Sequence, residues 1–152
     1  MSAETIEEDI LAHCVAGRTL QIARIIGAHY DKALAETGVT PQQLTLLSMI
    51  CKMGSPSASA MLPFLKMDQS TLSRNLERMV AKGWLEASPS EQDARVRCYS
   101  TTSQGEAAMV EAHAAWQHAQ SWAEEALGTS GINGLKSIAH HLNPLLPYDM
   151  ND

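Results

Sequence analysis

Polar and charged side chains gather between positions 69 and 78, and their types are those that bind nucleic acid. They include Gln69, Ser70, Ser73, Arg74, Glu77 and Arg78. Amide and hydroxyl groups can hydrogen-bond base edges, and guanidinium groups can bind guanine or phosphate. A helix with this face could therefore read the major groove of DNA. On spacing alone, an ordinary surface helix followed by a hairpin explains the same residues.

The surrounding residues predict the element that carries this face. Asp68 can cap a helix by accepting a backbone N–H bond. One apolar stripe follows at helical spacing, made of Leu72, Leu76, Met79 and Val80. Gly83 stands where a helix-ending glycine belongs. We therefore expect a helix from Asp68 to Lys82, followed by strands at 84–87 and 95–100.

The rest of the chain is expected to be helical and to form one domain, residues 1–152. The expected helices are Glu4–Glu36, Thr40–Lys52, Ser57–Leu65, Ser103–Leu127 and Ile132–Leu146. Ser103 and Glu106 have capping-box spacing, and a break is expected at Gly128–Gly131. The predicted fold is mainly α, with a helix-turn-helix formed by residues 57–82 and a two-stranded wing.

Five motifs occur in an order and spacing that carry a family resemblance. They are Thr40-Pro41-Gln42 with Leu44–Met49, Asp68–Arg74, Lys82-Gly83-Trp84-Leu85, Asp93-Ala94-Arg95 and Thr102–Gly105. From about Gly38 to Glu106 the chain resembles the MarR family of winged helix-turn-helix regulators. The resemblance assigns DNA contacts to Ser70, Thr71, Ser73, Arg74, Asp93 and Arg95. Gln69 replaces a common arginine and Arg97 an apolar strand residue, so the operator sequence does not carry over.

The resemblance implies a transcriptional regulator whose partner is double-stranded DNA. Helix 68–82 would enter the major groove, and Arg95 would enter the minor groove. Asp93 would hold the wing tip by pairing with Arg95 or a backbone donor. Residues 38–102 would form the DNA-binding lobe, and helices 4–36 and 103–146 would form a homodimer. A repressor that binds palindromic operators is the expected function.

The charge distribution bears on this expectation. The whole chain has a net charge of −6. Six basic and five acidic side chains between Lys66 and Arg97 give that segment a net charge of +1, so the remaining residues carry −7. A weak overall field predicts modest nonspecific affinity for DNA. The acidic balance also suits a winged-helix protein-interaction module that binds no DNA, and this alternative stays open.

The first helix carries candidates for a switch. Relatives often bind small aromatic carboxylates, and His13, Arg18, His29 and Tyr30 could bind such an effector. Each could instead hydrogen-bond across a dimer. Other relatives sense peroxide through a thiol, so Cys14 beside Arg18 is a redox candidate. A buried apolar role at the dimer interface is the alternative for Cys14.

Several function classes lack support in the sequence. No catalytic constellation, phosphate-binding loop or cofactor motif is apparent, so an enzyme is not expected. Three cysteines at wide spacings predict neither a disulfide framework nor a zinc site, and His113, His118, His140 and His141 have poor spacing for a helical metal site. No apolar run is long enough for a membrane helix, and no signal core begins the chain, so we expect a cytoplasmic protein.

Overall fold

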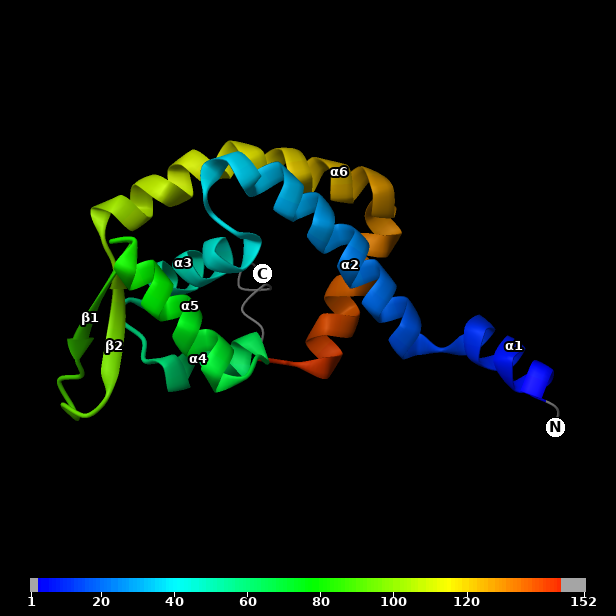
Figure 1. Cartoon of the computed structure of the whole chain (residues 1–152), viewed down its shortest axis with the longest axis horizontal. Coiled ribbons are helices and arrows are strands. Elements are labelled where there is room, and N and C mark those ends of the chain that lie inside the picture. The colour runs from blue at the N-terminus through cyan, green and yellow to red at the C-terminus, as the bar shows by residue number, and fades with distance from the viewer. Residues whose placement is uncertain (1–2, 146–152) are drawn as a thin grey trace.

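The computed structural model describes residues 3–145, and these form a mainly α winged-helix fold, as predicted. The elements are α1 (Ala3–His13), α2 (Val15–Leu34), the 3-10 helix η1 (Ala35–Thr37), α3 (Pro41–Met53), α4 (Ala58–Leu65), α5 (Gln69–Ala81), β1 (Leu85–Pro89), β2 (Arg97–Thr101) and α6 (Ser103–Leu142). Figure 1 shows α3, α4, α5 and the wing as one lobe, spanned by α2 and α6, while α1 projects away from it.

The core of the lobe confirms the predicted apolar stripe of α5. Leu72, Leu76 and Met79 are fully buried, and Val80 packs at the edge of the same core. They meet buried side chains of α3 and α4, including Leu46, Ile50 and Met61. Burial of a side chain of this size contributes about 1.5–3 kcal/mol. The outward face of α5 is thereby fixed, because its inward face is fully used.

The predicted cap of α5 is present, and α3 begins with a cap as well. Asp68 accepts a hydrogen bond from the Thr71 backbone N–H at 2.8 Å. Thr40 and Gln43 form a reciprocal capping box at the start of α3. Gly83 has φ +73°, the left-handed conformation expected after a helix. The start and end of α5 are thus set by local sequence.

The wing strands lie one to two residues further along than predicted. Leu85 pairs with Thr101, and Pro89 pairs with Arg97, in an antiparallel ladder. Trp84 is excluded from the strand because its N–H bonds to the Met79 carbonyl at the end of α5. At the tip, the Val96 N–H donates to the Asp93 carbonyl at 2.9 Å, so the turn extends to Val96.

The expected single helix 4–36 is wrong. The backbone at Cys14 is extended, with ψ 106°, and separates α1 from α2. The Cys14 thiol caps α2 by accepting from the Gly17 N–H at 3.4 Å. Gly17 is also a weak helix former, which disfavours continuation through this point. At the other end α2 stops at Leu34, and η1 leads to Gly38 with φ +68°.

The start and the kink of α6 also differ from expectation. Thr102, not Ser103, is the N-cap and accepts from the Gly105 N–H at 3.1 Å. Gly128 alone departs from helical geometry, with φ +65°, so the break does not extend to Gly131. The helix ends at Leu142, before Asn143, and the predicted end at residue 146 lies outside the described residues. Pro144 explains this stop, because it disfavours helical backbone in the residue before it.

Gly105 is expected to be intolerant of a side chain. A Cβ atom there would lie 2.2 Å from the Trp84 carbonyl oxygen and 2.9 Å from Thr101 Cγ2. Since the nearest atom is backbone, G105A should lower the free energy of unfolding by about 1–3 kcal/mol. G134A is the matched control, because a Cβ at Gly134 meets nothing within 4 Å. It should be neutral or stabilise by about 0.4–1 kcal/mol in urea unfolding. Equal stability of the two variants would contradict this packing.

Candidate DNA interface and adjoining cavity

A network of hydroxyl groups surrounds Asp68 at the start of α5. Ser70 Oγ donates to Asp68 Oδ1 at 2.5 Å, and Thr71 Oγ1 donates to Asp68 Oδ2 at 2.6 Å. Hydrogen bonds from the Ser70 and Thr71 side chains, and then from the Thr71 N–H, hold the pKa of Asp68 well below its usual range. The hydroxyl protons of Ser70 and Thr71 are therefore used within the helix. Their oxygens can still accept hydrogen bonds.

Arg74 is braced against the same turn. Its Nε donates to the Ser70 carbonyl, and its Nη2 donates to Ser70 Oγ, both at 3.2 Å. The guanidinium remains exposed, as do Gln69 and Arg78. Ser73 is half-buried on the same helix. An exposed cation held at the start of a helix-turn-helix second helix has the chemistry to bind a base edge or a phosphate.

Two contacts that the sequence did not reveal hold α5 in place. Asn75, only 9% exposed, donates its amide to Gln42 Oε1 of α3 at 3.2 Å. Lys82 donates to the Gly38 carbonyl at 2.8 Å, and its ammonium lies 4.1 Å from the centre of the Trp84 ring. A mid-helix amide and a terminal lysine are thus used for positioning. The sequence signal for the role of Asn75 is a polar residue at a helix position whose neighbours on the same face are apolar.

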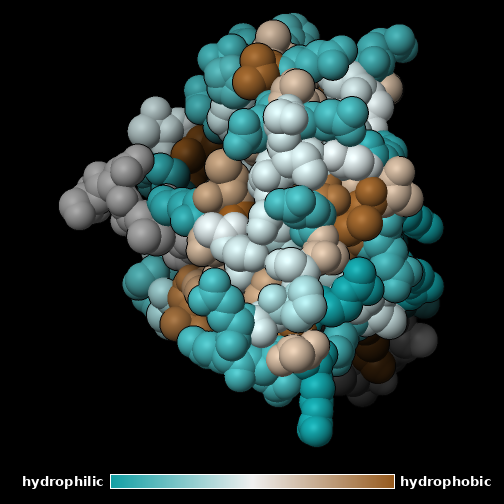
Figure 2. Space-filling model, turned by 90° about the vertical axis from the view of Figure 1, so that its left-hand side faces the viewer, coloured by the Kyte–Doolittle hydropathy of each residue, from teal (hydrophilic) through white to brown (hydrophobic). Residues whose placement is uncertain are grey.

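The wing places its arginines on the surface. Arg95 and Arg97 are both exposed. Asp93 Oδ1 accepts from the Arg95 backbone N–H at 2.9 Å, which is the backbone pairing expected for the wing tip. Figure 2 views the molecule from the wing side, where hydrophilic and neutral surface is interrupted only by small, separate apolar patches. The face is suited to a polar partner more than to another protein core.

A cavity of about 700 Å³ lies between the lobe and α6. Its lining is mostly apolar and includes Leu44, Met49, Met109 and Trp116 from α3 and α6. The polar members are Tyr30, Thr45, Ser48, Lys52 and His113. Burial, and then the charge of Glu124, raise the pKa of Tyr30, whose hydroxyl donates to Gln120 Oε1 at 2.6 Å. An apolar cavity with a few polar groups and a cation is typical of a small-molecule site.

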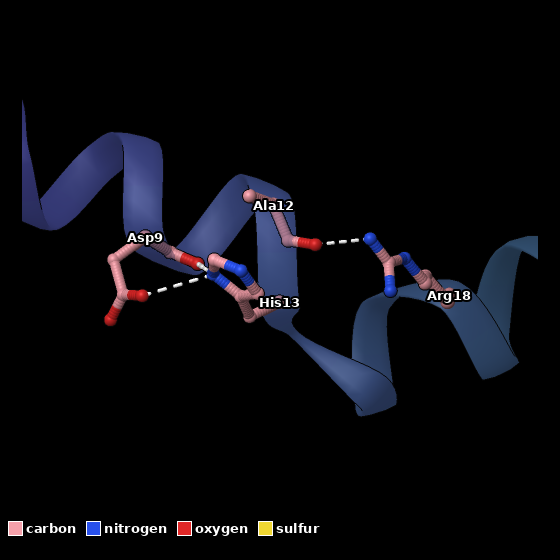
Figure 3. Close-up of polar contacts among 4 residues, drawn as sticks. All are labelled: Asp9, Ala12, His13 and Arg18. Carbon is pink, nitrogen blue, oxygen red and sulfur yellow. Dashed lines mark hydrogen bonds and ion pairs between the residues drawn. The ribbon is translucent and has the colours of Figure 1, made fainter.

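The four predicted effector residues do not come together in this cavity. Tyr30 lines it, whereas His13, Arg18 and His29 do not. His29 instead stacks on Trp122, with ring centroids 3.7 Å apart. Figure 3 shows His13 paired with Asp9 and the Arg18 guanidinium bonded to the Ala12 carbonyl, both beside the α1–α2 break. Sequence reasoning missed Lys52, because the cavity joins helices about 60 residues apart.

Cys14 is exposed at the α1–α2 break, and its sulfur accepts from the Gly17 N–H. Arg18, the expected partner of a thiolate, is turned to Ala12 instead. Cys51 is also exposed, near the end of α3. Within residues 3–145, no three histidine, cysteine or acidic side chains cluster as a metal site, and none of the helices there could cross a membrane.

Comparison with family models matches one segment of the chain, which contains the helix-turn-helix and the first strand of the wing. Residues 37–96 match the model of the MarR family. No curated protein sequence matches the chain significantly. The structural comparisons extend beyond the matched segment to both flanking ends.

Three solved structures illustrate the likeness. Bordetella bronchiseptica BpsR, described for its regulation by 6-hydroxynicotinic acid, aligns over 86% of this chain and 94% of its own, with 17% identity and a TM-score of 0.78. A MarR mutant from E. coli in complex with operator DNA aligns over 89% and 96%, with 20% identity and a TM-score of 0.76. A probable transcriptional regulator from Pseudomonas aeruginosa aligns over 87% and 98%, with 21% identity and a TM-score of 0.75. At these identities the likeness shows a shared fold.

Proposed function

Because its residues 37–96 belong to the MarR family of DNA-binding transcriptional regulators, we propose that this chain is a ligand-responsive repressor. It would bind palindromic operators as a homodimer in the cytoplasm. Each α5 helix would enter a major groove, and each wing would place Arg95 in the flanking minor groove. Minor-groove arginine is favoured where the groove is narrow.

The braced guanidinium of Arg74 carries this proposal. Two hydrogen bonds to Ser70 restrict the side chain before DNA arrives. A restricted side chain loses less entropy on binding, so more of the contact energy contributes to affinity. The Asp68 network further limits the donors on this turn, so base selection would depend on Gln69, Arg74 and acceptor oxygens.

Exposed apolar side chains on α1, α2 and the end of α6 support the homodimer. They are Ile6, Ile10, Leu11, Val15, Leu20, Ile22, Ile25, Leu135, Ile138 and Leu142. Leu11 is 84% exposed and Val15 is 74% exposed in the single chain. Apolar surface of this extent marks an interface, and a second copy of the same helices is the simplest partner.

The cavity beside α3 and α6 supports regulation by a small ligand. Lys52 supplies a cation at its edge, and Trp116 supplies an aromatic wall. An aromatic carboxylate would match both groups, and 6-hydroxynicotinic acid, which regulates BpsR, has this chemistry. Since α3 belongs to the lobe and α6 leaves it, a ligand between them could shift the orientation of α5.

Binding-site selection from random duplexes tests the proposal. The selected sites should contain two inverted half-sites, and sedimentation equilibrium of the complex should give two chains per duplex. The logarithm of the binding constant should fall linearly with the logarithm of the salt concentration, because arginine contacts release counterions from phosphate. Free protein sedimenting as a monomer near 16.5 kDa would contradict the homodimer. Absence of salt-dependent duplex binding would favour a protein-interaction module instead.

A further inference from the structure

The last described turn of the chain returns to the helix-turn-helix. Asn143, which directly follows α6, is 5% exposed. Its side-chain amide donates to the Pro63 carbonyl at 3.1 Å and to the Phe64 carbonyl at 3.4 Å. Both acceptors lie at the end of α4, about 80 residues earlier in the sequence. The side chain therefore joins the C-terminal stretch of α6 to the first helix of the helix-turn-helix.

The two carbonyl groups that accept from Asn143 lie at a helix end and need a hydrogen-bond donor from outside the helix. The last four carbonyls of a helix have no intrahelical donor. Lys66 ends α4 in a left-handed conformation and satisfies Leu62, which leaves the carbonyls of Pro63 and Phe64 to other donors. Asn143 supplies two bonds from one buried amide group. A buried amide that loses such acceptors bears a desolvation cost, so this contact favours one position of α4.

The kink in α6 makes this contact geometrically possible. Gly128 has φ +65° and ψ 169°, which redirects the remaining helical turns. In Figure 1, α6 runs over the top of the molecule, bends, and descends toward α4. The stretch beyond the kink carries Leu135, Ile138 and Leu142, which are part of the proposed dimer interface. The same short segment thus contacts the lobe and faces the proposed partner chain.

We propose that Asn143 is a positioning residue that sets the separation of the two α5 helices in the dimer. This role depends on the DNA-binding dimer proposed above. The lobe already joins α6 through β2 and α2 through η1, and the buried cluster of Leu34, Val39 and Ala112 packs it against both helices. The Asn143 bonds add an attachment at the far end of α6, to α4, which restricts swinging of the lobe about that cluster. Loss of these bonds should widen the range of half-site spacings that the dimer accepts.

Asn143→Asp is the test variant, because it preserves the shape of the side chain and removes its N–H donors. Asn133→Asp is the matched control: it adds the same charge at an exposed position between Gly128 and Leu142. Duplexes with the selected half-sites would be made at the preferred spacing and one or two base pairs away. N143D should lose about tenfold in affinity at the preferred spacing, and its affinities across spacings should become more equal. N133D should keep the wild-type profile.

Hydrogen exchange of the DNA-free protein provides a second readout. N143D should speed the exchange of the amides at the end of α4 relative to wild type and N133D, and N143A replaces N143D if the latter does not fold. Unchanged exchange in α4 would overturn the contact itself. Faster exchange with an unchanged spacing profile would overturn the positioning role. If the wild-type protein shows no preference for paired half-sites, the proposed dimeric regulator is wrong, and so is this role of Asn143. The exchange rates in α4 would still show in that case whether the Asn143 contact itself exists.

Discussion

Arg74→Ala and Arg95→Ala are expected to weaken operator binding without unfolding the protein. Both side chains are exposed, and neither belongs to the apolar core. If Arg74 reads a guanine, its loss should cost about 1–3 kcal/mol and relax specificity at one position. If it contacts only phosphate, all sequences should weaken together and the salt slope should fall by about one unit. Arg95→Ala should act most strongly on operators with narrow flanking minor grooves.

Fluorescence anisotropy across a set of operator variants and salt concentrations would measure both effects. Arg24→Ala is the control, because Arg24 is an exposed arginine on α2, outside the lobe. Urea unfolding of each variant would show that the fold is intact. Operator affinity that is unchanged in both Arg74→Ala and Arg95→Ala would refute the assignment of α5 and the wing as the DNA-reading elements.

Ser70 illustrates how far the sequence could describe this interface. Its position on the outer face of α5 followed from the spacing of Leu72, Leu76 and Met79, which is a local property. Its partners did not follow, because whether a hydroxyl faces DNA or Asp68 depends on the geometry of the first helical turn. In the structure, the Ser70 hydroxyl donates a hydrogen bond to Asp68 and accepts one from Arg74. Local periodicity thus predicts which side chains form the outer face of α5, whereas the hydrogen bonds among them depend on the three-dimensional structure.

The errors in element boundaries have a common cause. Thr102 and Ser103 are both acceptable caps, and neighbours from elsewhere in the chain favour Thr102. Its hydroxyl donates to the Gly83 carbonyl, and the turn that it starts places Gly105 against the Trp84 carbonyl. These partners are about 20 residues away, beyond the reach of a capping pattern. The break at Cys14 had a weaker signal, a glycine three residues later.

The effector cavity could not be predicted for a similar reason. Its walls come from α2, α3 and α6, which are far apart in the sequence. A cation beside apolar residues on one helix favours Arg18, because the sequence does not show which helices meet. In the sequence, Lys52 only marks the end of a helix. Tyr30 is the predicted effector residue that does line the cavity.

Release of DNA by an aromatic carboxylate is expected to depend on Lys52. A carboxylate at the edge of this largely apolar cavity would gain from the ammonium group of Lys52, since a charge-assisted hydrogen bond is stronger than a neutral one. The ligand would bind one arrangement of α3 and α6 better than the other and so shift the lobe. Lys52→Gln should keep operator affinity while raising the concentration of 6-hydroxynicotinate needed for half-release by about tenfold or more.

The decisive assay compares Lys52→Gln, Lys136→Gln, Arg18→Gln and Cys14→Ser in one DNA-release experiment with 6-hydroxynicotinate, benzoate and peroxide. Lys136→Gln is the control for charge, because Lys136 is exposed on α6 and does not line the cavity. Quenching of tryptophan fluorescence would report binding directly, since Trp116 lines the cavity. A defect confined to Arg18→Gln would instead place the effector site at Arg18, the residue predicted from the sequence, which lies beside the α1–α2 break. Release by peroxide alone, abolished in Cys14→Ser, would replace the ligand switch by a thiol switch, because the exposed sulfur of Cys14 is open to oxidation.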